Sequence, residues 1–553
     1  MKDAQNSLFF KLFPKCRRTF DHTKFIFQKT SFRDMLLVPY TGPFGRPELL
    51  HLLRRTLFGI NKSDVAYFNN QTLQQVVTTL LTPPPPPSNP PLVDYAGDPT
   101  LAIGTTWVNG PSNSNYQTQR GSSLRSWWSG QMLTQGVSLR EKMVIFLHNH
   151  APTTVGGAVN EAIYAYRYNV LLRNYALGNF KAFIRALTID PAMLYYLNGR
   201  SNFRNAPNEN YARELQELFT VGKDLPAYFT EGDVQQAAKV LTGWRVNNTT
   251  LQTYFDSNVH DPANKTFSNF YGNTVIQGRT GPTAGDLELD DLLNMIFAHP
   301  EVARYLVRKI YRFFVYYDID SAIEANVIVP LADLFRSGNY AIAPVLRALF
   351  SSQHFFDQIE SKGCYIRNPL EFCVGTGRTL GLTGMAAASD TTGRYRNYRF
   401  FRDSANQQTM DIGGPPDVSG WPAYYQMPGF HELWINADTL RKRKEFIDRM
   451  IVSGSSGMKA DILLFTASLA NPSDPNALIA EVIELLHTLP SDPPVIASLK
   501  SILLSNQASD SYWTVAWNTY QANPSNTTNL NVVRTRLQTF YQAVLGMAEY
   551  NLI

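Results

Sequence analysis

Ser138-Leu-Arg-Glu-Lys-Met-Val-Ile-Phe-Leu-His-Asn-His150 is the stretch that shows most clearly how this chain folds. Ser138 and Glu141 have the S-x-x-E spacing of a capping box, and the apolar residues from Leu139 to Leu147 recur at helical spacing. A helix is therefore expected to begin here and to run towards the two histidines.

The same periodicity extends outward in both directions. Towards the N-terminus, helices are expected over residues 47–58 and 64–81. Towards the C-terminus, they are expected over 161–177, 179–187, 208–221, 231–241, 286–298, 300–317, 323–337 with a break at Pro330, 343–351, 436–452, 461–469, 475–489, 494–504 and 529–548. Strand-like alternation is confined to residues 245–255 and 269–277, which are expected to pair as a small hairpin-like insert. The predicted fold is mainly α, a large bundle-like body with long loops and a minor β insert.

Three segments divide the 553 residues. Residues 1–45 are a basic, aromatic extension, 46–450 the helical core, and 451–553 a C-terminal helical extension packed on it. Within the core, a Pro-rich loop over 82–123 and a loop-rich insert over 384–427 are expected. A hydrophobic content of 44% and a charged content of 17% are typical of a packed protein and exclude a disordered one.

The formal net charge of +5 is carried by the N-terminal extension, which holds eight Lys and Arg residues against three Asp. The rest of the chain is neutral, so nucleic-acid binding by the main body is not expected. For residues 1–45, two interpretations stand: docking on a membrane surface or a protein, or a terminal extension that packs poorly. No apolar stretch is long enough for a transmembrane helix, and no clear signal peptide is visible, which favours a cytoplasmic location.

Cysteine usage gives no metal or redox motif. The chain has three cysteines, an odd number, and no C-x-x-C motif; they are Cys16, Cys364 and Cys373. Reduced thiols are therefore expected.

His148 and His150 form the densest ionisable cluster. In a continuous helix, residues two apart lie about 200° around the axis and cannot grip one metal ion. If the chain becomes extended at His148, ahead of Pro152, the H-x-H spacing becomes a metal pair. The alternative is a structural helix end with a hydrogen-bonded imidazole.

Glu214 and Asn208 are the second cluster. Both fall on or beside the apolar stripe of the helix expected over 208–221, whereas Glu209 and Arg213 form an i, i+4 pair on its other face. A carboxylate directed at a core needs a partner. Glu214 is therefore a candidate general base or metal ligand, and the alternative is an ion pair with Arg167, Arg173 or Arg304.

Two further groups have a structural and a functional interpretation. His260-Asp261-Pro262 with Lys265 is either a functional loop or a capped turn. The second group consists of Trp421, Tyr424, Tyr425 and Trp434. These aromatic side chains either form a wall on which carbohydrate stacks or simply pack together.

Several segments together resemble a bacterial family catalogued as domain of unknown function 1800, over about residues 46–450. They are His51-Leu-Leu-Arg-Arg-Thr-Leu-Phe-Gly59, residues 141–150, 168–180, 190–194, 207–222, 241–244, 260–267 and 418–422. The resemblance implies export and a sulfatase-like partner protein. It implies no established reaction.

Three hypotheses for function follow. The first is a metal-assisted hydrolase in which His148, His150 and Glu214 hold a divalent ion, zinc or manganese, with Asn208 beside them. The second is a metal-free acid/base enzyme on glycans, in which Glu214 pairs with another carboxylate. The third is a non-catalytic scaffold or surface-assembly protein. We expect the 148–150 segment and the inward edge of the 208–221 helix to meet, with a histidine within about 5 Å of Glu214.

Overall fold

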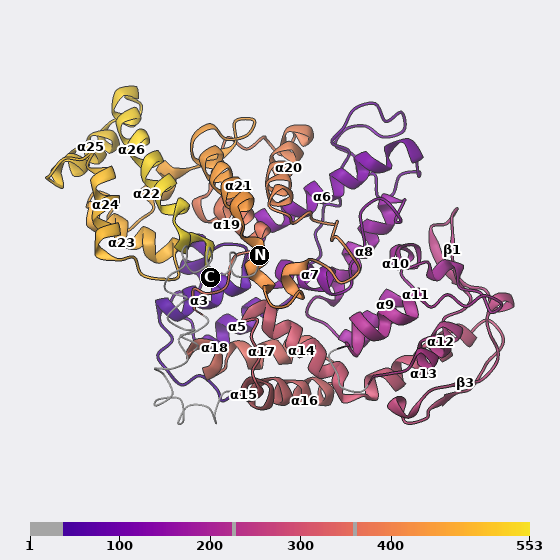
Figure 1. Cartoon of the computed structure of the whole chain (residues 1–553). Helices are drawn as coiled ribbons and strands as arrows, with labels where there is room; N and C mark the ends of the chain where they lie inside the picture. Colours follow the sequence, from indigo (N-terminus) through magenta and orange to yellow (C-terminus); the bar gives the residue numbers. More distant parts are fainter. Residues whose placement is uncertain (1–36, 224–227, 358–361) are drawn as a thin grey trace.

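The computed structural model describes residues 37–223, 228–357 and 362–553, and it confirms the mainly α fold (Figure 1). The helices before residue 300 are α3 (Arg46–Thr56), α4 (Lys62–Tyr67), α5 (Leu73–Leu81), α6 (Gln117–Thr134), α7 (Arg140–His150), α8 (Ala162–Tyr175), α9 (Phe180–Thr188), α10 (Pro191–Tyr196), α11 (Asn210–Glu214), α12 (Glu231–Val240) and α13 (Ala284–Ala298). The later ones are α14 (Pro300–Phe314), α15 (Ser321–Ile323), α16 (Val329–Ser337), α17 (Ile342–Phe350), α18 (Gln353–Asp357), α19 (Pro369–Leu380), α20 (Thr391–Gln407), α21 (Ala437–Asp448), α22 (Ile462–Ala467), α23 (Pro475–Leu486), α24 (Pro493–Leu503), α25 (Ser511–Ala522) and α26 (Thr527–Gly546).

Shorter helical segments connect these elements. α11, α15 and α21 each continue into a π-helical turn: η3 (Leu215–Thr220), η6 (Glu324–Ile328) and η9 (Arg449–Ser453). The 3₁₀ turns are η1 (Ser114–Tyr116), η2 (Gly199–Ser201), η4 (Ser257–Val259), η5 (Asn269–Tyr271), η7 (Pro422–Tyr424), η8 (Phe430–Trp434) and η10 (Ala548–Asn551). The break predicted at Pro330 is wrong, because η6 leads directly into α16 with Pro330 in its first turn.

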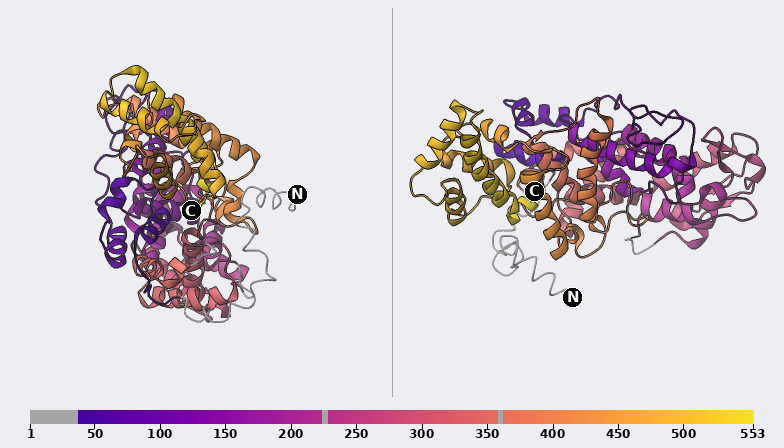
Figure 2. Two further views of the ribbon diagram at one scale, coloured as in Figure 1. Left: turned by 90° about the vertical axis from the view of Figure 1, so that its left-hand side faces the viewer. Right: turned by 90° about the horizontal axis from the view of Figure 1, so that it is seen from above.

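The helices form an elongated body with α7 near its middle (Figure 1). Helices α22–α26 lie at one end, and α9–α13 lie with strands β1 and β3 at the other end, as the view from above in Figure 2 also shows. A contiguous cluster of buried apolar side chains extends from Leu49 in α3 to Leu552 near the C-terminus. Tyr550 packs its ring on Phe372 of α19, with ring centroids 5.5 Å apart. The C-terminal helices therefore share the core of the helices before them.

Two helices occupy stretches predicted as loops. α6 begins inside the expected 82–123 loop, and α20 fills much of the expected 384–427 loop. They pack on each other at Gly130, where an added Cβ would lie 2.7 Å from the ring of Tyr398. Because such helices are stabilised by close packing of small residues, their apolar periodicity is weak, and the sequence prediction missed them.

The long helix predicted over 64–81 is in fact two helices, α4 and α5. Asn70 between them has a left-handed φ of 62°, and Thr72 caps α5 by accepting a hydrogen bond from the N–H of Gln75. A left-handed residue ends the helical hydrogen-bond ladder, so periodicity alone could not separate the two.

The β insert pairs differently from the prediction. β1 (Trp244–Asn247) pairs with β2 (Gln252–Phe255), β3 (Lys265–Thr266) with β4 (Val275–Ile276), and β5 (Leu382–Thr383) with β6 (Lys459–Ala460), all antiparallel. Residues 245–255 thus close on themselves, which costs less loop entropy than pairing with 269–277.

Two further expectations concern cysteines and the membrane. Cys364 and Cys373 are free thiols, as predicted, and burial raises the pKa of Cys373 to about 12. In the part of the chain that the structure describes, no helix is both long and apolar enough to cross a membrane. Cys16 and most of the 1–45 extension lie outside the described residues.

Candidate functional site

The end of α7 is helical through both histidines. The backbone leaves helical geometry at Ala151 (φ −134°), directly before Pro152. The extended conformation that an H-x-H metal pair requires is therefore not adopted, and the two imidazoles face different neighbours. The capping box at the other end is also not formed. Ser138 accepts a hydrogen bond from the N–H of Arg140 (3.2 Å), but the buried Glu141 pairs with Arg173 instead.

His148 lies in an aromatic cage. Its ring centroid is 5.2 Å from that of Trp128, 5.8 Å from Trp421 and 6.3 Å from Tyr168. Neither ring nitrogen has a hydrogen-bond partner among the described residues, and the side chain is buried. Burial lowers the pKa of His148 to about 3, so the imidazole is neutral at physiological pH.

His150 uses both ring nitrogens. Its Nε2 lies 3.0 Å from the carbonyl oxygen of Phe219, and its Nδ1 lies 3.3 Å from Nζ of Lys309. Because a carbonyl only accepts, Nε2 donates and Nδ1 is left to accept from the ammonium group. Burial and the charge of Lys309 hold the pKa of His150 well below its usual value. The contact with Phe219 confirms that the 148–150 segment and the 208–221 segment meet.

The predicted 208–221 helix is α11 followed by the π-helical η3. Val221 N–H donates to the carbonyl of Gln216 (2.9 Å), five residues back, and Gly222 ends the segment with a left-handed φ of 83°. The i, i+4 pair of Glu209 and Arg213 is present at 3.3 Å.

Asn208 lies before α11 and makes local contacts. Its N–H donates to Oδ1 of Asn202 (2.9 Å), and its own Oδ1 accepts from the N–H of Asn210 (3.0 Å). This is a turn that caps the start of the helix rather than a side chain directed at a substrate.

Glu214, the last residue of α11, is half-buried rather than enclosed in the core. Burial raises its pKa, and the nearby charges of Glu217 and Asp417 raise it further. Lys223 and Arg213 act in the opposite direction but do not cancel these effects. Two of the three arginines considered as its partners are used elsewhere: Arg173 bonds to Glu141, and Arg167 donates to the carbonyl of Leu251.

Asp417, whose charge acts on Glu214, comes from a distant part of the chain, on the loop that precedes η7. Its Oδ1 accepts from the N–H of Ser419 (2.7 Å) and its Oδ2 from the hydroxyl of Tyr425 (2.9 Å). The loop is held against the end of α7, because Oδ1 of Asn149 accepts a hydrogen bond from the N–H of Trp421 (2.8 Å).

Tyr196, at the end of α10, is the third member of this cluster. Burial raises the pKa of Tyr196, and the charges of Asp417 and Glu214 raise it further, so its hydroxyl stays protonated. We call Tyr196, Glu214, Asp417 and Tyr425 the carboxylate cluster.

A hollow of about 450 Å³, part of it open to solvent, lies beside the carboxylate cluster. Ser419 and Tyr425, which both bond to Asp417, contribute to its wall together with Asn149, His150 and Lys309. Glu214 and Asp417 themselves are not part of this lining. The hollow therefore has hydrogen-bond donors and a cation on its wall, and two of its lining residues bond to Asp417.

The other sequence candidates are mostly structural. Of the predicted aromatic wall, Trp421 and Trp434 are buried and only Tyr425 is well exposed, so no four-membered stacking surface forms. Nζ of Lys265 pairs with Oε2 of the buried Glu288 (2.5 Å), and His260 lies 3.1 Å from Oε1 of the same carboxylate, so the Asp-Pro turn is anchored in the core.

No group of three or more His, Cys, Asp and Glu side chains in residues 37–223, 228–357 and 362–553 is arranged to hold a metal ion. The structure thus brings together the backbone segments of His150 and Glu214. It does not join His148, His150 and Glu214 into one ligand set.

Sequence reasoning missed Asp417 and Tyr196, and it considered Tyr425 only as part of the aromatic wall. The signal available was the Pro-Pro-Asp-x-Ser-Gly pattern at 415–420, in which an Asp begins a turn and is presented from a loop. Only the aromatic residues of this segment were predicted to have a function, and Asp417 was not.

The fold and the site define a mainly helical protein with a loop-borne carboxylate cluster. The chain belongs to the family described as Protein of unknown function (DUF1800), whose model matches residues 51–552. The match extends beyond the 46–450 range of the motifs and includes the C-terminal helices. Neither the curated proteins nor the solved structures contain a match.

Proposed function

We propose that this protein is a hydrolase that works by metal-free acid/base chemistry, with Glu214 as the proton donor and Asp417 as its ionised partner. The observation that carries the proposal is the pairing itself. Besides Glu217 on its own helical segment, Asp417 from a distant segment raises the pKa of Glu214, and no arginine is bound to Glu214 in the described residues.

General acid catalysis needs a carboxyl group whose pKa is raised towards neutrality and a second group that remains charged. Glu214 is suited to the first role because burial and its acidic neighbours favour its protonated form. Asp417 is suited to the second because Ser419 N–H and the hydroxyl of Tyr425 both donate to it. A pair of carboxyl groups of this kind is the usual apparatus for cleaving glycosidic bonds.

A polyhydroxylated substrate, a glycan, suits the surroundings of the pair. The exposed ring of Tyr425 offers a stacking face, and Lys309, Asn149 and Ser419 offer hydrogen-bonding groups in the adjacent hollow. The sulfatase-like partner implied by the family resemblance stays a prediction, as does docking through residues 1–45.

The metal-assisted version of the hydrolase has less support. Both ring nitrogens of His150 are already hydrogen-bonded. The ring of His148 faces an aromatic cage instead. A divalent ion held by His148, His150 and Glu214 would require the end of α7 to rearrange. The scaffold hypothesis rests on composition alone and makes no use of the raised pKa of Glu214.

The test is release of reducing ends from a panel of oligosaccharides and polysaccharides by wild-type protein, Glu214→Gln and Asp417→Asn. Each substitution is expected to lower the rate by at least about 100-fold, the usual contribution of a positioned acid or base. Glu209→Gln is the matched control, because Glu209 lies at the start of the same helical segment, is paired with Arg213 and is not among the groups that shift the pKa of Glu214. It is expected to retain most activity.

Chelation separates the hypotheses. Activity that survives treatment with a chelator supports acid/base chemistry, whereas activity that is lost and then restored by zinc or manganese supports the metal-assisted version. Wild-type protein that binds glycans without cleaving any member of the panel contradicts the proposal and favours the scaffold.

A further inference from the structure

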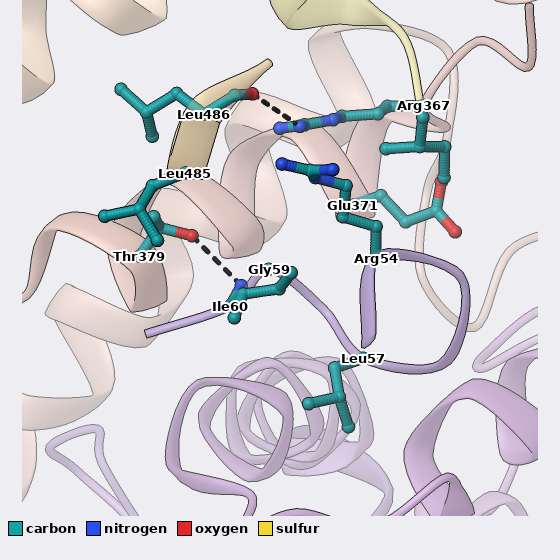
Figure 3. Close-up of a pocket in the computed structure, with 10 residues that line it drawn as sticks. Arg54, Leu57, Gly59, Ile60, Arg367, Glu371, Thr379, Leu485 and Leu486 are labelled. Carbon is teal, nitrogen blue, oxygen red and sulfur yellow. Dashed lines mark hydrogen bonds between the residues drawn. The ribbon is translucent and has the colours of Figure 1, made fainter. Parts of the chain in front are cut away.

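A second cluster of charged groups lies far from Glu214, where α3 meets α19 and α21. Arg54 comes from α3, Arg367 from the segment before α19, and Arg443 from α21. Arg367 and Arg443 are 8% and 2% exposed, and Arg54 is half-buried. We call these three residues the arginine cluster. Figure 3 shows the guanidinium groups of Arg54 and Arg367 side by side at one side of a pocket.

The carboxylate that lines this pocket, Glu371, is already occupied. Its Oε1 pairs with Nζ of the buried Lys142, and its Oε2 accepts from the N–H of Asn368 (2.9 Å) in a capping box. Glu484, which acts electrostatically on Arg54, is itself paired with Arg46 at 2.8 Å and is exposed. Among the side chains that the structure describes as lining the pocket, two guanidinium groups therefore face a single carboxylate, which is already paired with Lys142.

The hydrogen bonds of the cluster go to neutral acceptors. Arg54 donates to the carbonyl of Glu484 and Arg367 to that of Leu486 (3.2 Å). Arg443 donates to the side chain of Asn551 (2.9 Å) and to the carbonyl of Arg367 (2.8 Å). The Nε of each of these three arginines has no hydrogen-bond partner within the described residues. Buried cations that lack carboxylate partners are strongly disfavoured unless an anion balances them.

The electrostatics agree with this geometry. Burial and then the charge of Arg367 lower the pKa of Arg54 to about 9. Burial lowers the pKa of Arg443 to about 9 as well, with Arg367 again repelling it. Arginines close together with unused N–H groups are typical of sites that recognise oxyanions, because two planar donors can share one tetrahedral acceptor.

We infer that the pocket between Arg54 and Arg367 binds a phosphate group. The pocket comprises about 350 Å³, a volume that includes solvent-open space at its mouth, so an oxyanion at the end of a larger molecule would bind at this mouth. The hydroxyl of Thr379, which accepts from the N–H of Ile60 (3.2 Å), keeps its own hydrogen to donate. Apolar walls from Leu57, Leu485 and Leu486 exclude water and strengthen the attraction.

The site is independent of the proposed hydrolase. Its residues come from α3, α19 and the end of α23, none of which carries a member of the carboxylate cluster. Arg54 belongs to the His51–Gly59 segment, which the acid/base proposal does not use. Binding at the pocket can therefore be measured without any substrate for Glu214.

The experiment is calorimetric titration of the full-length protein with inorganic phosphate and with phenyl phosphate, at constant ionic strength maintained with chloride. Wild-type protein is expected to bind one phosphate group with a dissociation constant of about 1 mM or tighter. Arg54→Gln and Arg367→Gln are each expected to weaken binding at least tenfold. Arg46→Gln, an exposed arginine on the same helix, is the matched control and is expected to leave binding unchanged.

Unfolding midpoints give a second readout if a variant folds poorly. Phosphate is expected to raise the midpoint of wild-type protein more than chloride at equal ionic strength, and to lose this advantage in Arg367→Gln. Preference for phenyl phosphate over inorganic phosphate identifies an ester-linked group as the ligand, and the reverse identifies the free ion. No saturable binding by wild-type protein, or equal binding by wild-type protein and Arg367→Gln, overturns the inference.

Discussion

Asn149 accepts a hydrogen bond of 2.8 Å from the backbone N–H of Trp421, and this contact fixes the Asp417 loop on the end of α7. The neighbouring Gly420 makes the approach close. Its φ is 93°, and a Cβ there would lie 2.4 Å from Oδ1 of Asn149. The helix end that carries His148 and His150 thus serves as the platform for the loop that carries Asp417.

Gly420→Ala is therefore expected to displace the loop. A side chain at positive φ that also clashes with Asn149 should cost about 1–3 kcal/mol of stability and lower hydrolysis by at least tenfold. Unfolding in urea and reducing-end release measure the two effects. Gly414→Ala is the control in the same loop, since its Cβ would meet only the flexible end of Asp411. Unchanged activity in Gly420→Ala would disprove the positioning role.

Acid lability should depend on His148. Its pKa is about 3 in the folded protein and near 6.5 when unfolded, so the unfolded state binds more protons between these values. The stability is complete above pH 6.5 and falls as the pH is lowered towards 3. Relative to wild-type protein, His148→Phe should gain about 1.4 kcal/mol for each pH unit below about 6.

Urea unfolding at several pH values measures this gain, and His150→Phe provides the contrast. Removing the imidazole of His150 leaves the carbonyl of Phe219 and Nζ of Lys309 without that contact, so a loss of stability at every pH is expected. A pH-independent difference between wild-type protein and His148→Phe would show that the aromatic cage does not suppress protonation.

The Lys142–Glu371 pair should respond unequally to removal of its two partners. Glu371→Gln removes the carboxylate that balances several buried cations and is expected to cost about 3–5 kcal/mol. Lys142→Met should lower the free energy of unfolding by less. Arg55 and Arg367 repel Lys142, and Arg55 is also attracted to Glu371. Denaturant unfolding of both variants tests the order. A larger loss in Lys142→Met would contradict the excess of positive charge on which the phosphate site rests.

The contact between α6 and α20 should be weakened by any side chain added at Gly130. Gly130→Ala places a methyl group against the ring of Tyr398 and is expected to lower stability by about 1–3 kcal/mol. Gly136→Ala is the control, because nothing lies within 4 Å of its added Cβ. Equal thermal unfolding midpoints for the two variants would mean that the helices are not in close contact there.

Apolar periodicity predicted α9, α14 and the other amphipathic helices, and it failed where a helix depends on its neighbour. α6 contains Gly121 and Gly130, and its contact with α20 replaces a regular apolar stripe. The π-helical turn after Glu214 was also beyond prediction, because it arises from hydrogen bonds to the fifth residue back rather than from residue types.

For the site, local reasoning selected Glu214 and placed its segment beside the histidines, as the contact between His150 and Phe219 confirms. The partner of Glu214 could not be predicted, because Asp417 arrives through a loop whose position depends on the contact between Asn149 and Trp421. His148 faces the aromatic cage because α7 continues to His150. The nearby Pro152 had favoured the opposite, an extended chain at His148.

The pairing of Glu214 with Asp417 is the central claim, and the pH dependence of stability tests it without a substrate. A carboxyl group whose pKa is raised by folding binds its proton more tightly in the folded state, so wild-type protein should lose stability as the pH rises from about 4.5 through the folded value. The measurement is the urea-unfolding free energy of wild-type protein, Glu214→Gln, Asp417→Asn and the double variant at pH 5 and pH 8. The account predicts that Glu214→Gln becomes more stable than wild-type protein at pH 8, and that this gain shrinks when Asp417 is already Asn. A Glu214→Gln variant that is less stable than wild-type protein at pH 8, or a gain that is the same with and without Asp417, would contradict it.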